Sequence, residues 1–182
     1  AKEGYQVVLT DINQAKAADF AGRIGKSAIA VEADVRDRSS LEQAFTKAID
    51  AFGQVDVVHA NAGVSNMKRA IELTEEDWDF NFDVNAKGVF LTNQVAVRHF
   101  LDKKFPGVIV NTASLASKIG APLLAHYSAS KFAVVGWTQA LAREHAKDGI
   151  RVNGLSAGPM KTLAASGIGD FRYILKWNEL NS

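Results

Sequence analysis

The chain has 182 residues and a formal net charge of +1, enough length for one domain with a substantial core. A charge this close to zero favours neither nucleic acid nor an anionic membrane as a partner, and no apolar run reaches the roughly 20 residues that span a bilayer. Cysteine is absent, which excludes disulfides and thiolate metal sites. We expect a single domain over residues 1–182, without a metal, in the cytoplasm.

Apolar runs alternate with amphipathic stretches along the chain. The runs are rich in β-branched residues, as buried strands are, and cover residues 5–10, 28–33, 55–60, 107–113 and 150–156. The stretches between them predict helices over residues 13–24 and 38–52, from Thr74, over roughly 82–105, and over 127–148. Because no Asn-Gly or Asp-Gly turn joins neighbouring strands, the pattern predicts an α/β fold, a doubly wound parallel sheet covered on both faces.

Polar or small residues stand where the first three strands end, which is where ligands bind in such sheets. Asp11 ends the first strand; it can accept hydrogen bonds from an adenosine ribose or, equally, cap a helix. Asp34-Val35 ends the second, where the carboxylate can bind adenine, although a solvated loop Asp is commoner. Asn61-Ala62-Gly63 ends the third; small residues let a planar ligand approach the backbone, and a plain turn also explains them.

The fourth strand ends at Thr112-Ala113-Ser114, and Tyr127-Ser128-Ala129-Ser130-Lys131 follows in the next helix. Tyr127 and Lys131 are one helical turn apart and so lie on one face. A tyrosine hydroxyl titrates near pH 10, too high for efficient acid–base work at neutral pH, and a neighbouring ammonium lowers that value. A serine hydroxyl can hold a carbonyl or alcohol oxygen. A chance surface pair has the same spacing, so this signal is weak by itself.

Two further positions are unusual. Asn85 and Gly88 lie early in a long predicted helix, although both residue types weaken helices. They indicate a local role, such as a distortion that holds a water molecule; the alternative is an ordinary Asn near a helix end. His126 directly precedes Tyr127, and we expect it to be partly exposed rather than to line a pocket. None of the 4 His residues has metal-ligand spacing.

Over about residues 4–160 the chain resembles the short-chain dehydrogenase/reductase family. The matching residues occur in the family's order: Asp11, Asp34-Val35, Asn61-Ala62-Gly63, Asn85, Ser114 and Tyr127-x-x-x-Lys131. The resemblance implies a catalytic tetrad of Asn85, Ser114, Tyr127 and Lys131. In it the tyrosine is the general acid/base, the serine orients the substrate oxygen, the lysine binds the nicotinamide ribose and lowers the tyrosine pKa, and the asparagine holds a water.

The resemblance also implies a nicotinamide cofactor. NAD (NADH) is expected rather than NADP, because no Arg or Lys follows Asp11 within four residues to receive a 2′-phosphate. The implied cofactor-binding residues are Asp11, Asp34, Val35, Asn61, Ala62, Gly63, Tyr127, Lys131, Gly158, Pro159 and Thr162.

Two parts of the chain resemble different members of this superfamily. Residues 55–153 are similar to bacterial sorbitol and 2,3-butanediol dehydrogenases, whereas the tail from about Ser156 is similar to enoyl-acyl carrier protein reductases. Those reductases place Tyr and Lys six residues apart, not four. We therefore interpret the chain as an NAD-dependent oxidoreductase that interconverts a secondary alcohol or polyol and its ketone, as a homotetramer acting on small molecules. Enoyl-acyl carrier protein reduction and a truncated, non-catalytic relic are the alternatives.

The family's first strand and Gly-rich phosphate loop would precede Ala1, so the resemblance implies an N-terminally truncated chain, and its mixed character suggests a chimera. Pyrophosphate groups rest on a helix N-terminus reached through such a Gly-rich turn. We therefore expect residues 1–182 alone to bind NADH poorly and to turn over little substrate. The strands that flank the absent one would expose apolar faces and unpaired backbone groups.

Overall fold

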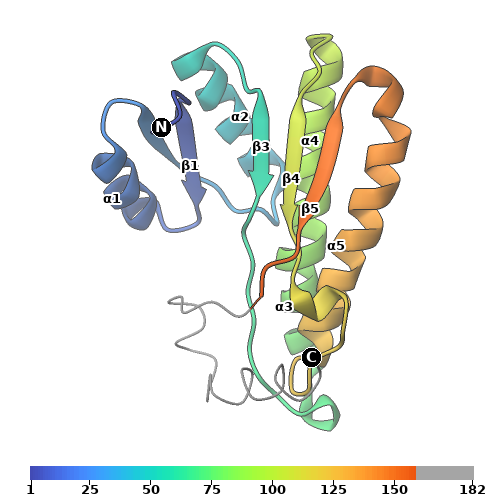
Figure 1. Cartoon of the computed structure of the whole chain (residues 1–182). Helices are drawn as coiled ribbons and strands as arrows, with labels where there is room; N and C mark the ends of the chain where they lie inside the picture. The colour runs from blue at the N-terminus through green and yellow to red at the C-terminus, as the bar shows by residue number, and fades with distance from the viewer. Residues whose placement is uncertain (159–182) are drawn as a thin grey trace.

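Strands and helices alternate along the chain in the computed structural model, which describes residues 1–158. The strands are β1 (Val7–Asp11), β2 (Ala28–Glu32), β3 (Val57–Ala60), β4 (Val108–Thr112) and β5 (Arg151–Leu155). The α-helices between them are α1 (Gln14–Ile24), α2 (Arg38–Phe52), α3 (Glu75–Phe82), α4 (Gly88–Asp102) and α5 (Ala125–Glu144) (Figure 1). Every strand pairing is parallel, which confirms the predicted α/β class.

The strands form two sheets instead of the single sheet expected from the sequence. β1 pairs with β2, and β4 lies between β3 and β5. Between β1 and β3 lies a cavity of about 430 Å³, lined by residues of both strands and of α2. Each of these two strands therefore has one edge without a partner strand within residues 1–158.

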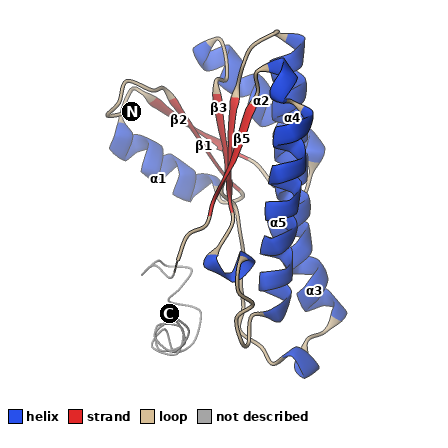
Figure 2. Cartoon of the chain, turned by 45° about the vertical axis from the view of Figure 1, so that its right-hand side comes forward, coloured by secondary structure: helices blue, strands red, loops and turns tan. Residues whose placement is uncertain are grey.

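The helices cover the two sheets unequally. α1 lies on one side of the strands, and α4 and α5 lie on the other (Figure 2). On the three-stranded sheet, the side chains that point away from α4 and α5 stay accessible: Val57 is 46% exposed and Leu155 is 52% exposed. Within residues 1–158, the predicted cover on both faces is therefore missing over β3–β5.

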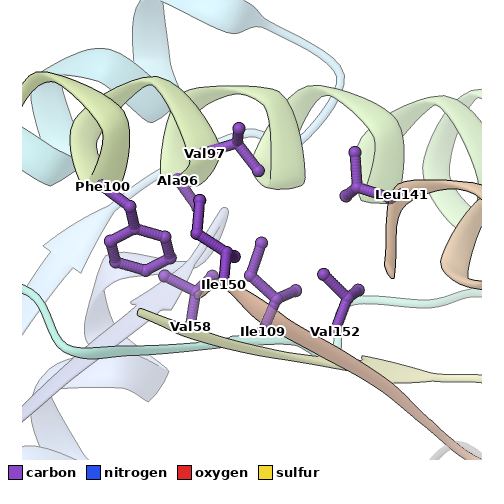
Figure 3. Close-up of a cluster of buried hydrophobic side chains, with 8 residues drawn as sticks. All are labelled: Val58, Ala96, Val97, Phe100, Ile109, Leu141, Ile150 and Val152. Atoms are coloured by element: carbon purple, nitrogen blue, oxygen red, sulfur yellow. The ribbon is translucent and has the colours of Figure 1, made fainter. Parts of the chain in front are cut away.

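The largest core lies between β3–β5 and the two long helices α4 and α5. Phe100 and Ile109 are fully buried there. They pack with Val58, Ala96, Val97, Leu141, Ile150 and Val152 (Figure 3). Gly107 is required beside this core, because a Cβ at that position would lie 2.4 Å from ring atoms of Phe100. The close contact between Gly107, just before β4, and the Phe100 ring fixes where β4 begins relative to α4.

Capping residues mark the ends of two helices, and one of them, Thr74, was predicted from the sequence. Asp37 accepts a hydrogen bond from the Ser39 amide at the start of α2, and Gly53, at φ +84°, ends that helix. Thr74 caps α3 through a capping box with Asp77.

The two helices predicted from Thr74 onward form one continuous helical run. α3 passes into a π-helix, η2 (Asp83–Lys87), which passes into α4. The residues at both junctions keep right-handed helical dihedrals, so no break occurs near Phe82. No helix within residues 1–158 is both long and apolar enough to cross a membrane.

Candidate functional site

Most of the predicted site residues lie at the carboxyl ends of the strands, as parallel sheets require. Asp11 is the last residue of β1, Asn61-Ala62-Gly63 follows β3, and Ser114 follows β4. Tyr127 and Lys131 lie in the first turns of α5. Because β3 and β4 are neighbours, their ends and the start of α5 meet in one region.

Asn85 joins the segment after β3 to α5. It is fully buried in the π-helix η2. Its Oδ1 accepts a hydrogen bond from the Val64 amide at 2.8 Å, and its Nδ2 donates to the Val64 carbonyl at 2.9 Å and to Ser130 Oγ at 3.0 Å. The helix distortion inferred from Asn85 and Gly88 is thus present. π-Helical turns of this kind are frequent at functional sites.

Lys131 is buried beside the same segment. Its side chain is 2% exposed, and its Nζ donates to the Thr112 carbonyl at 2.8 Å. Burial lowers the pKa of the Lys131 ammonium to about 8. A Cβ at Gly63 would lie 3.4 Å from Lys131 Nζ and 3.2 Å from Asn85 Oδ1. Gly63 therefore brings the backbone close to both groups, where a larger residue would crowd them.

Tyr127 and Ser114 complete this region from two sides. Lys131 Nζ lies 5.8 Å from the centroid of the Tyr127 ring, and both Tyr127 and Ser114 are half-buried. Ser114 Oγ accepts a hydrogen bond from the Ala116 amide at 3.1 Å, in the short helix η3 (Leu115–Ser117) that packs against α5. Among the described contacts its hydroxyl bonds neither Tyr127 nor Lys131. The structure thus brings Asn85, Lys131 and Tyr127 together, with Ser114 on the adjoining turn.

The predicted adenosine-binding residues lie at the ends of the two-stranded sheet. Asp11 is exposed, and its Oδ1 accepts a hydrogen bond from the Asn13 amide at 2.8 Å. Asp34 forms an ion pair with Arg36 at 2.6 Å, and that guanidinium holds the pKa of the Asp34 carboxyl below its ordinary value. Val35 packs on the start of α4, where a Cβ at Gly88 would lie 2.7 Å from its Cγ2.

Thr112 is a site residue that the sequence did not single out. Its carbonyl binds Lys131, and its hydroxyl donates to Asn61 Oδ1 at 3.0 Å while lying 2.8 Å from His59 Nε2. Thr112 ends β4 and Asn61 follows β3, so only the pairing of these two strands brings them together. No local sequence signal could have identified this contact.

His126 differs from its expected exposure. It was predicted to be partly exposed, and it is fully buried with its Nε2 2.8 Å from Asn66 Oδ1. The prediction was wrong because the side chain points toward the segment after Gly63, which comes from a distant part of the chain.

Other features fall outside this region. Gly158 is exposed beyond β5, whereas Pro159 and Thr162 lie outside the described residues. The cavity between β1 and β3 is lined by none of the four predicted catalytic residues. Within residues 1–158, no group of three or more His, Asp or Glu side chains is placed to hold a metal ion. The catalytic and cofactor-binding roles of the named residues stay predictions.

Comparison with known protein families and curated sequences gives consistent matches. The chain matches, over residues 1–182, the family described as enoyl-(acyl carrier protein) reductase. It is 34% identical over 170 residues to the oxidoreductase UcpA of Salmonella typhimurium, covering 92% of this chain and 65% of that protein. It is 35% identical over 167 residues to L-2,3-butanediol dehydrogenase of Corynebacterium glutamicum, covering 89% and 65%. The chain thus spans slightly less than two thirds of these relatives.

A solved structure is similar over nearly the whole chain. It is a 3-ketoacyl-(acyl-carrier-protein) reductase from Brucella melitensis complexed with NADH, with a TM-score of 0.90 and 35% sequence identity. The match covers 94% of this chain and 73% of that one. Sequence and fold therefore point to the same group of enzymes.

Proposed function

The chain belongs to the short-chain dehydrogenase/reductase family of oxidoreductases, and on that basis we propose that it interconverts a secondary alcohol or polyol and the corresponding ketone with NAD. The observation that carries this proposal is the placement of Tyr127 and Lys131 one helical turn apart, next to Gly63. This arrangement puts a proton donor and a buried cation where two strand ends meet. Family membership gives the broad class, and the reaction type and cofactor are the proposal.

In the proposed reaction, proton transfer is the work of the chain's own residues. Tyr127 takes the hydroxyl proton of the alcohol during oxidation and returns it to the ketone oxygen during reduction. The Ser114 hydroxyl donates a hydrogen bond to that oxygen and holds it near Tyr127. The Lys131 ammonium stabilises the tyrosinate; with a pKa of about 8 it remains mostly charged at neutral pH. The nicotinamide, when bound, supplies the hydride acceptor or donor.

The residues at the strand ends fit such a cofactor. Asn61-Ala62-Gly63 is exposed, and a side chain at Gly63 would crowd Asn85 Oδ1, which would lie 3.2 Å from its Cβ. This lets a planar ring and its ribose approach the backbone next to the Lys131 ammonium. Asp11, exposed at the end of β1, suits a ribose with free hydroxyls and disfavours a 2′-phosphate.

Enoyl-thioester reduction is the second candidate, because the matched family carries that description and the tail from about Ser156 resembles such enzymes. The active segment favours carbonyl chemistry instead. With Tyr127 and Lys131 one turn apart and Ser114 nearby, the proton source faces an oxygen bonded to the carbon that exchanges hydride. We also propose a small-molecule substrate, a cytoplasmic location and a homotetramer. The 46% exposure of Phe132 on α5 supports a contact between copies.

The test uses an extended chain, in which the family's first strand and Gly-rich loop are added upstream of Ala1. Its activity is assayed with alcohols, diols and ketones. We expect it to oxidise secondary alcohols or diols and to reduce ketones with NAD(H). Assays with crotonyl thioesters and NADH serve as the comparison. Reduction of thioesters without activity on ketones or diols would reverse the ranking, and no turnover of either would favour the non-catalytic alternative.

A further inference from the structure

The turn that carries Tyr127 starts without the usual support. α5 begins at Ala125, and its N-cap residue Leu124 makes no side-chain capping bond. Leu123, just before it, has φ +64°, a left-handed conformation that a leucine seldom adopts. A helix start leaves several backbone N–H groups without helical partners, and such ends open readily. Contacts from elsewhere must therefore hold this turn in place.

One such contact comes from Asn66. His126, in the first turn of α5, is fully buried with its Nε2 2.8 Å from Asn66 Oδ1. Two residues after Asn66, the Lys68 amide donates a hydrogen bond to the Leu123 carbonyl at 2.9 Å. The segment between Gly63 and Arg69 is thus bonded both to the strained loop and to the first turn of the helix.

The direction of the Asn66–His126 bond follows from the neighbours of Asn66. Asn66 Nδ2 donates to Asp77 Oδ1 at 3.2 Å, and a carboxylate can only accept. Asp77 is kept ionised by the Lys68 ammonium, 2.5 Å away, which lowers its pKa. Asn66 Oδ1 therefore faces His126, and His126 must donate from Nε2. Burial lowers the pKa of the imidazole, which keeps it neutral with Nδ1 unprotonated.

The same bonds extend to Asn85. The Nδ2 of the fully buried Asn81 donates to Asn66 Oδ1 at 3.1 Å, so that oxygen accepts from both α3 and α5. Asn81 Oδ1 in turn lies 3.5 Å from Asn85 Nδ2. Hydrogen bonds from Asn66 thus lead in one direction, through Asn81, to Asn85 and in the other, through His126, to the turn that carries Tyr127.

We propose that Asn66 is a positioning residue, which fixes the first turn of α5 through His126 and takes its own orientation from Asp77. The catalytic consequence, alignment of Tyr127, rests on the proposed function; the anchoring of the helix start does not. In place of a cap, α5 has a bond between the buried His126 and the half-buried Asn66, and a buried group that loses its partner pays the full desolvation penalty.

The unsubstituted 182-residue chain gives the first measurement. Nitrogen-15 NMR near neutral pH reports which ring nitrogen of His126 carries the proton. We expect the neutral form protonated at Nε2. A signature of the neutral form protonated at Nδ1 contradicts the deduced direction and overturns the proposal, because its Nε2 cannot donate to Asn66 Oδ1.

Three substitutions then separate the bond from general packing. Gln at position 126 can place an amide N–H near the position of the histidine Nε2, whereas the shorter Asn cannot reach it. We expect hydrogen exchange of the amides of residues 128–131 to be about tenfold faster in His126→Asn and Asn66→Ala, and close to the parent in His126→Gln. The amides of α2 should exchange unchanged in all three. Equal exchange at residues 128–131 in all variants would sink the idea.

Activity distinguishes the anchor from the proposed chemistry. In the extended chain we expect Asn66→Ala to lower kcat about tenfold with KM for NADH nearly unchanged, and His126→Gln to restore kcat relative to His126→Asn. Suppose that neither the parent nor any variant turns over substrate, while hydrogen exchange of residues 128–131 changes as expected. The role of Asn66 in holding the start of α5 then stands, and the proposed function fails. If the parent is active and Asn66→Ala keeps full kcat, Asn66 does not position Tyr127.

Discussion

The two sheets are built from strands of nearly equal length, yet they differ in what their side chains meet. In the β3–β4–β5 half, Phe100 and Ile109 are fully buried. In the β1–β2 half, no residue of β1 is buried, and Val31 is the one buried residue of β2. Apolar composition alone therefore does not bury a parallel strand. Burial depends on what packs against a strand, and β3–β5 lie against the two long helices α4 and α5.

The better-packed half also holds the groups of the proposed proton transfer. A buried polar network reinforces it: Asn93 and Asn111 exchange two hydrogen bonds of 2.8 Å, and Asn111 also donates to Thr138 Oγ1. These bonds tie α4, β4 and α5 together around the elements that carry Lys131 and Ser114. The β1–β2 half carries the three residues predicted to bind the adenosine part of the cofactor, Asp11, Asp34 and Val35.

The largest expected effect compares the cores of the two halves. Phe100→Ala should lower the free energy of unfolding by about 3–5 kcal/mol, because it empties the centre of the main core. Phe20→Ala, on the exposed side of α1, should change it by less than about 1 kcal/mol. Urea unfolding of both variants, followed by circular dichroism, measures the difference. Equal losses would mean that the two halves are packed to the same degree.

The next effect tests whether chemistry belongs to the well-packed half. Tyr127→Phe in the extended chain should reduce turnover at least about 10²-fold, since it removes the proton donor and keeps the ring. NADH binding, measured by nicotinamide fluorescence, should remain close to that of the parent. Tyr5→Phe, in the exposed start of the other half, is the matched control and should leave turnover unchanged. Activity of Tyr127→Phe within threefold of the parent would show that Tyr127 is not the acid/base.

Local signals predicted the elements well where caps were decisive. The predicted range 38–52 agrees with α2, and the predicted cap Thr74 begins α3. Asn85 and Gly88 predicted a helix distortion because both are poor helix formers within a long apolar pattern. The π-helix at Asp83–Lys87 is that distortion. The strand runs were placed within two residues at each end, which is the usual uncertainty of such boundaries.

Contacts between distant segments could not be predicted in this way. The burial of His126, the role of Thr112 and the bond to Asn66 depend on how β3, β4 and α5 come together, which no local pattern encodes. The division into two sheets depends likewise on which strand edges find a partner. The motif at Tyr127 and Lys131 was recognisable only because it combines with the strand-end residues in a known order.

A third effect concerns the buried charge of the well-packed half. Burial lowers the pKa of Lys131 to about 8, so the charged form is disfavoured in the folded chain relative to the unfolded one. This destabilisation is fully present below pH 8 and declines as the pH rises toward the ordinary lysine pKa. Lys131→Met should therefore stabilise the fold at neutral pH, on the order of 2 kcal/mol, with a smaller gain in alkaline buffer. A gain that does not vary with pH would contradict this origin.

The smallest effect belongs to the β1–β2 half and its exposed carboxylate. Asp11→Asn in the extended chain should lower the ratio of kcat/KM for NAD to that for NADP about tenfold, because it removes a negative charge that repels a 2′-phosphate. The effect is limited because Asp11 is exposed and solvent screens its charge. Asp50→Asn, an exposed carboxylate on α2 away from the strand ends, is the matched control. A parent that already uses both cofactors equally, or an unchanged ratio in Asp11→Asn, would remove Asp11 from cofactor selection.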